Sequence, residues 1–84
     1  MELDFSDYNI PEHTKGALER YVNQRFFPGS FLTAVLTNNL IGAICYADRE
    51  NEAALRDIVA FAYNRLPQEC CGSEDKVYAW TTRK

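Results

Sequence analysis

The amino-acid sequence predicts an all-α fold, a compact bundle of four to five short helices with no β-sheet. Apolar residues recur at helical spacing in residues 10–25 and 54–66, and no segment of strand length alternates apolar with polar residues. Proline, glycine and helix-capping residues separate these stretches at short intervals. Eighty-four residues are enough for one domain (1–84), in which residues 1–9 form an extended lead-in.

The first predicted helix begins near Pro11, because proline is tolerated in the first turn of a helix. Asn9 and Glu12, three residues apart, form a candidate pair of capping residues at this start. An apolar stripe follows and ends in the basic Arg25. Pro28 and Gly29 then stop the helix.

Residues 26–47 contain no charged side chain and are long enough to cross a bilayer. The adjacent amides of Asn38 and Asn39 would be costly in the middle of a membrane, and Pro28 interrupts the start of the segment. We therefore expect two buried helices here, the first capped by Ser30 and the second capped by Asn39. One bent helix over the same residues is the alternative.

Two more helices complete the prediction. Asp48 caps the first of them, and its apolar stripe continues to Leu66, where Pro67 ends it. A loop over residues 68–72 carries two cysteines. Ser73 then caps a short last helix that contains Trp80.

The charge pattern argues against nucleic-acid binding. The net charge is −3, and the nine basic residues are scattered, whereas a phosphate-binding domain needs them clustered. The acidic residues form two loose groups, which is too sparse for a mimic of DNA and is typical of a solvated surface.

The three cysteines do not predict a disulfide scaffold, because their number is odd and no signal peptide is present. Cys45 is expected to be a small buried apolar residue. A bond between the neighbours Cys70 and Cys71 would need a strained ring, so we expect free thiols in a reducing cytoplasm. With His13 as the only histidine, no metal site and no cofactor are expected, and His13 is interpreted as a surface or capping residue.

Much of the chain from Ile10 onwards follows the pattern IPxHTxxAL…PGSFLxAVLxNxL. In this pattern the sequence resembles a family of small proteins encoded by bacteriophages and prophages. The resemblance implies expression in a bacterial cytoplasm, and it implies no catalytic residues. The chain departs from the pattern at two places, Phe26-Phe27 before the proline and the Cys70-Cys71 pair.

Two groups of residues are candidates for binding. Arg25, Gly29 and Ser30 lie around the start of the second helix, where free backbone N–H groups attract anions and glycine allows close approach. The alternative is that Gly29 makes a turn, Ser30 caps its own helix and Arg25 lies in solvent. Tyr78 and Trp80 near the chain end either form an interface or pack in the core.

The sequence therefore favours a small non-catalytic binding protein that engages and modulates a bacterial host protein, with counter-defence as one such role. The alternative is a binder of a small anionic ligand, such as a nucleotide, at Arg25, Gly29 and Ser30. An enzyme is disfavoured because one histidine and dispersed carboxylates provide no catalytic set. The long uncharged segment also predicts a homo-oligomer, most simply a dimer.

Overall fold

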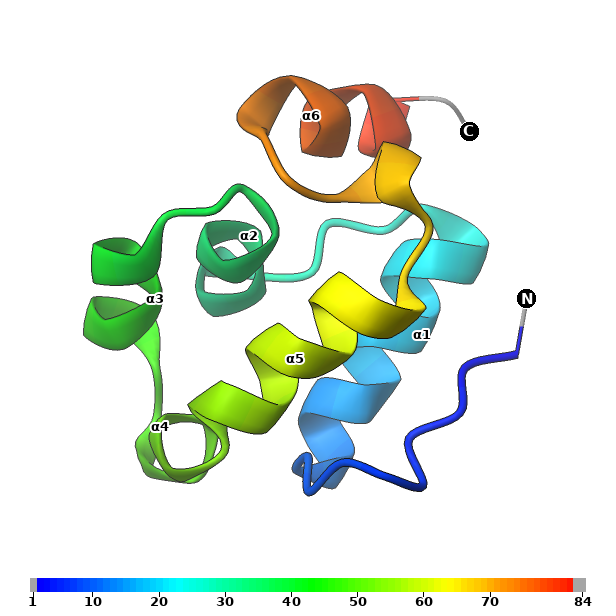
Figure 1. The fold of residues 1–84 in the computed structure, drawn as a ribbon. Coiled ribbons are helices and arrows are strands. Elements are labelled where there is room, and N and C mark those ends of the chain that lie inside the picture. The colour runs from blue at the N-terminus through cyan, green and yellow to red at the C-terminus, as the bar shows by residue number, and fades with distance from the viewer. Residues whose placement is uncertain (1, 83–84) are drawn as a thin grey trace.

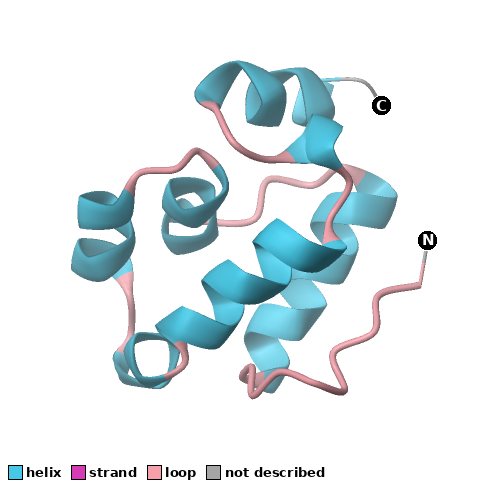
Figure 2. Cartoon of the chain, viewed as in Figure 1, coloured by secondary structure: helices cyan, strands magenta, loops and turns pink. Residues whose placement is uncertain are grey.

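The computed structural model describes residues 2–82, and all regular secondary structure in that range is helical. The predicted all-α class is confirmed, with more and shorter helices than expected (Figure 1). Short loops connect them (Figure 2). The elements are α1 (Glu12–Gln24), α2 (Ser30–Leu36), α3 (Leu40–Tyr46), α4 (Arg49–Ala53), α5 (Leu55–Arg65), the 3₁₀ turn η1 (Gln68–Cys70) and α6 (Glu74–Thr82).

Three of the predicted caps are confirmed by hydrogen bonds. The Asn39 side chain accepts from the Gly42 N–H at 3.0 Å, and Asp48 accepts from the Asn51 N–H at 2.7 Å. The Ser73 hydroxyl accepts from the Lys76 N–H at 3.2 Å. Each bond spans three residues, so local sequence is sufficient to specify it.

Two predicted caps are wrong. The cap position of α1 is Pro11, and the Asn9 N–H donates to the Asp57 carboxylate, 2.9 Å away on α5. Ser30 is the first residue of α2, and Gly29 is its cap, with a positive φ of 92°. A tertiary partner draws Asn9 away from the helix start, and glycine supplies the backbone conformation needed before α2.

The helix predicted from Asp48 to Leu66 is interrupted at Ala54, which separates α4 from α5. Asn51 on α4 points inward and is buried with Thr14 of α1, and the hydroxyl of Thr14 donates to the Asn51 side-chain oxygen. A buried polar pair needs its hydrogen bond. This pairing therefore fixes α4 against α1 at the point where α5 departs.

Replacing Thr14 by valine is expected to lower the free energy of unfolding by about 1–3 kcal/mol, because the buried Asn51 amide loses its partner. Urea unfolding followed by circular dichroism measures the change. Thr14→Ser keeps the hydroxyl and should lose less. Equal stability of Thr14→Val and the wild type would show that the pair contributes nothing.

The core lies where α1, α5 and the N-terminal segment meet. Tyr21 and Leu18 of α1 and Phe61 of α5 are fully buried. Phe5 stacks on Phe61 with ring centroids 4.5 Å apart, and Tyr8 meets the same ring edge-on at 5.3 Å. The extended lead-in is therefore part of the core, and the radius of gyration of 11.5 Å is that of a compact chain.

α6 and η1 are attached to α1 through aromatic side chains. The Trp80 indole N–H donates to the Tyr21 carbonyl at 2.8 Å, and the Tyr21 hydroxyl donates to the Cys70 carbonyl at 2.6 Å. Burial raises the pKa of the Tyr21 phenol, so it remains a donor. The Arg25 guanidinium lies 3.7 Å from the centroid of the Trp80 ring.

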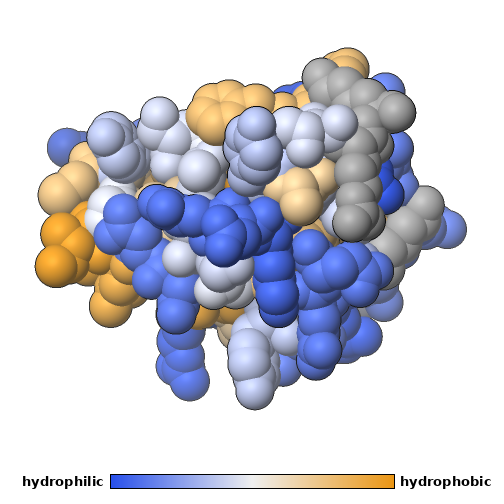
Figure 3. All heavy atoms as spheres, turned by 90° about the horizontal axis from the view of Figure 1, so that it is seen from above, coloured by the Kyte–Doolittle hydropathy of each residue, from blue (hydrophilic) through white to orange (hydrophobic). Residues whose placement is uncertain are grey.

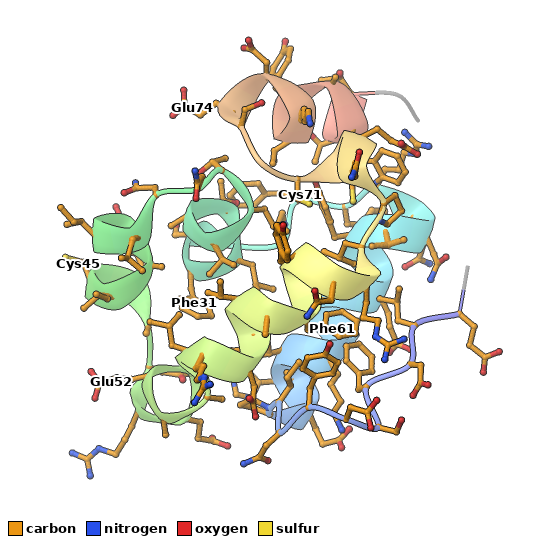
Figure 4. All side chains as sticks on the ribbon, viewed as in Figure 1. Phe31, Cys45, Glu52, Phe61, Cys71 and Glu74 are labelled. Atoms are coloured by element: carbon orange, nitrogen blue, oxygen red, sulfur yellow. The ribbon has the colours of Figure 1, made fainter. Side chains whose placement is uncertain are left out.

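The expectation that residues 26–47 are buried is correct for α2 and wrong for α3. Four of the seven α2 residues are buried, whereas α3 buries Ala43 alone. Cys45 is exposed on α3, contrary to its predicted burial (Figure 4). Within residues 2–82, no helix is long and apolar enough to cross a membrane.

Candidate functional site

Nine large apolar side chains of the described residues are exposed, and most of them lie around α3. Monomeric proteins rarely leave a wide apolar surface open to water. Figure 3 shows the most hydrophobic exposed atoms gathered at the edge of the molecule where α3 lies. Eight of the nine belong to two surfaces, which are candidates for binding.

The first surface, the α3–α5 apolar face, consists of five side chains from the two helices that name it. Leu40, Val59 and Tyr63 line a shallow hollow of about 590 Å³ together with Leu55. Ile41 and Ile44 extend the face along α3, and they are 77% and 51% exposed. The face is made of Leu40, Ile41, Ile44, Val59 and Tyr63.

The second surface, the aromatic cleft, lies between α2 and α6 beside α3. Phe27, Tyr46 and Tyr78 line a hollow of about 450 Å³, and each of these side chains is more than 60% exposed. Glu74, in the first turn of α6, also lines the cleft, and it lies at the end of α6 that is nearer to α3 (Figure 4). The remaining lining residues are Ser30, Thr33, Ala34, Thr37, Asn39, Val77 and Thr81.

Threonine hydroxyls form much of the polar lining of the cleft. Thr37 donates its proton to the Thr33 carbonyl at 2.7 Å, and Thr81 donates to the Val77 and Tyr78 carbonyls at 3.2 and 3.1 Å. A hydroxyl has one proton, so these two oxygens offer only lone pairs to a bound molecule. The Thr33 hydroxyl is shielded from solvent and has no partner among the described residues.

Replacing Thr33 by valine is expected to raise the free energy of unfolding by about 1 kcal/mol, because a shielded hydroxyl without a partner is removed at constant shape. The same exchange at Thr14, whose hydroxyl is paired, has the opposite expected sign. Urea unfolding of the two variants side by side measures both. A loss of stability in Thr33→Val would show that its hydroxyl has a partner in solution.

The structure does not bring Arg25 together with Gly29 and Ser30. Gly29 and Ser30 line a separate hollow of about 200 Å³ that includes the Asp48 carboxylate and lacks Arg25. Hydrogen bonds from the Asn51 N–H and from His13 lower the pKa of Asp48, so the carboxylate is ionised. A hollow with this charge repels anions, and the geometry does not support the predicted anion site.

Tyr78 and Trp80 separate into the two roles that the sequence left open. Tyr78 is 71% exposed in the aromatic cleft and remains a candidate for binding. Trp80 is 8% exposed and packs beside Tyr21, with ring centroids 6.4 Å apart. Of the two roles left open, Trp80 therefore packs in the core, because its ring is covered by the core and by Arg25.

His13 is paired with a carboxylate and does not belong to a metal-binding cluster among the described residues. His13 Nε2 lies 3.2 Å from the Asp48 carboxylate, with both side chains more than half exposed. Within the described residues, no three histidine, cysteine or acidic side chains cluster to hold a metal ion.

Cys70 ends η1 and Cys71 follows it, and both are free thiols. Their mutual hydrogen bond lowers the pKa of Cys71 to about 7 against the opposing effect of burial, with help from Lys76. The same bond and burial raise the pKa of Cys70.

The sequence interpretation missed three contributors to the cleft, Phe27, Tyr46 and Glu74. They lie on different elements, so no local spacing joins them. The one available signal was the lack of charge in residues 40–47, which fits an exposed binding helix as well as a buried one. Comparisons with protein-family models, with curated proteins and with solved structures find no match to this chain.

Proposed function

We propose that this protein is a non-catalytic binding protein that engages and modulates a protein of its bacterial host. The observation that carries the proposal is the aromatic cleft, in which the rings of Phe27, Tyr46 and Tyr78 stay largely exposed. Large rigid rings dominate the binding energy of protein interfaces. Counter-defence in the bacterial cytoplasm is the form of modulation that the phage-type pattern of residues 10–40 favours.

His13, Asp48 and Arg25 lie outside the cleft lining, and each contacts another residue of the fold. Asp48 caps α4 and holds His13, and the Arg25 guanidinium stacks on Trp80. A general acid or base has to exchange a proton with a substrate. These side chains are engaged in contacts that hold the fold together.

The α3–α5 apolar face takes a second copy of the chain in this proposal. A two-fold dimer places the same surface of each copy against the other. The five side chains that define the face are uncharged, but Arg56 also lines its hollow, so pairing two copies has to leave that guanidinium in contact with water. The dimer leaves the aromatic cleft on the neighbouring side of α3 for the host protein.

Capture from a bacterial lysate tests the proposed function. The tagged wild-type protein and Tyr63→Ala are expected to retain the same host protein, identified by mass spectrometry. Tyr78→Ala is expected to retain at least about tenfold less, because an interface ring is a dominant contact. Tyr63 is the control, since it is an exposed tyrosine outside the cleft, at 87% against 71% for Tyr78.

Two results would contradict the proposal. Recovery of no host protein above background by the wild type would remove the host-binding function. Equal recovery by Tyr78→Ala and Tyr63→Ala would remove the aromatic cleft as the binding surface.

A further inference from the structure

The aromatic cleft has a chemistry more specific than that of an apolar groove. Its described lining combines three aromatic rings with one charged side chain, the carboxylate of Glu74. The faces of aromatic rings are electron-rich and attract organic cations. We propose that the aromatic cleft binds an organic ammonium ion, either a lysine side chain of the protein partner or a free polyamine.

The three rings are available to such a ligand. Phe27 lies in the loop before α2, Tyr46 ends α3, and Tyr78 lies on α6, so the rings approach the cleft from three elements. The ring pairs in contact among the described residues are Phe5–Phe61, Tyr8–Phe61 and Tyr21–Trp80. None of these pairs includes a cleft ring, and each cleft ring is more than 60% exposed, so a guest in the cleft can reach all three.

Part of the polar lining can only accept hydrogen bonds from a ligand, whereas Ser30 and Asn39 can also donate them. Thr37 and Thr81 have committed their protons to helix carbonyls, so their oxygens accept hydrogen bonds from an ammonium group. Glu74 adds a charged acceptor on the α6 side. An anionic ligand would face these lone pairs and the carboxylate without a described lysine or arginine in the lining.

The size and the overall charge agree with this ligand class. A volume of about 450 Å³ lies within the range of small-molecule sites, about 300–1,000 Å³. It accommodates an alkylammonium chain but no folded element. The net charge of −3 also raises the local concentration of cations near the surface.

A series of four-carbon compounds separates charge from hydrophobicity. Butylammonium, butanol and butyrate are titrated into the ¹⁵N-labelled protein, and amide shifts of the cleft residues are followed by NMR. Butylammonium is expected to bind about tenfold more tightly than butanol, and butyrate more weakly than both. Binding of butanol or butyrate at least as tight as that of butylammonium would overturn the proposal, as would the absence of butylammonium shifts in the cleft.

Matched variants locate the cation. Glu74→Gln and Tyr78→Ala are each expected to weaken butylammonium binding at least about fivefold. Asp75→Asn makes the same chemical change as Glu74→Gln outside the cleft and should leave binding unchanged. All three side chains are exposed, so the fold is retained. Equal effects of Glu74→Gln and Asp75→Asn would show nonspecific attraction and contradict the site.

A third comparison distinguishes the two sources of the ammonium group. A short peptide with one lysine, the same peptide with norleucine, and spermidine are titrated in the same way. Preference for the lysine peptide over the norleucine peptide identifies a side chain of a protein partner as the source. This source rests on the proposed function. Tight binding of spermidine with no lysine preference identifies a free polyamine, and the ammonium site then stands even if host capture fails. Binding of none of the three would overturn the proposal.

Discussion

Replacing Trp80 by alanine is expected to lower the free energy of unfolding by about 3–5 kcal/mol, as for other buried aromatic residues. Three contacts are lost together: the packing beside Tyr21, the indole hydrogen bond to the Tyr21 carbonyl and the stacking of Arg25. A domain of this size has a total stability near the low end of about 5–15 kcal/mol. The substitution therefore removes much of the stability of the fold.

Urea unfolding followed by far-ultraviolet circular dichroism measures this loss, since Trp80 is the only tryptophan and its fluorescence disappears in the variant. Tyr78→Ala on the same helix is the control. Its side chain is exposed, and the expected change is within about 0.5 kcal/mol. Similar losses in both variants would contradict the attachment of α6 through Trp80.

The contribution of Arg25 separates into two effects. Its φ of 60° is in the left-handed region, which costs a non-glycine residue about 1–2 kcal/mol. Stacking on Trp80 offsets part of that cost. Arg25→Gly removes the stacking on Trp80 and also removes the backbone strain, because glycine adopts a positive φ without cost. Arg25→Ala removes the stacking and keeps the strain. Arg25→Gly is therefore expected to be the more stable of the two variants.

The parts of the fold that the sequence predicted correctly depend on neighbours in the chain. The caps at Asn39, Asp48 and Ser73 each need a backbone N–H three residues away. The failures involve distant partners: Asn9 bonds to Asp57, 48 residues away, and Arg25 meets Trp80, 55 residues away. Such pairings depend on how the helices pack, which local spacing does not encode.

The exposure of α3 was beyond prediction for a different reason. Burial of an uncharged helix lowers the free energy of the protein. The sequence of the helix does not say whether the same chain or another molecule covers it. Here the chain covers only Ala43. The same lack of charge that indicated a core helix therefore also fits the proposed surface for association, and this gives the second large prediction.

Replacing both Ile41 and Ile44 by glutamate is expected to convert a dimer of the 9.6 kDa chain into monomers. The five side chains of the α3–α5 apolar face are 42–87% exposed. They present about 600 Å², at about 150–250 Å² for each fully exposed large side chain. A stable dimer buries about 800 Å² per copy, so the face supplies most of that area and the residues around it have to supply the rest. Each isoleucine contributes about 1.5–3 kcal/mol on burial, which predicts a dissociation constant at least about 100-fold higher.

Light scattering at micromolar concentrations measures the association, and Gln24→Glu/Gln68→Glu is its control. That variant adds the same two charges at exposed positions outside the face, so it is expected to remain a dimer. Both isoleucines are more than half exposed in one copy, so the glutamates should leave the helical circular dichroism unchanged. A monomer mass for the wild type would contradict the dimer. A monomer mass for the control would show that the added negative charge, and not the change in the α3–α5 apolar face, separates the copies.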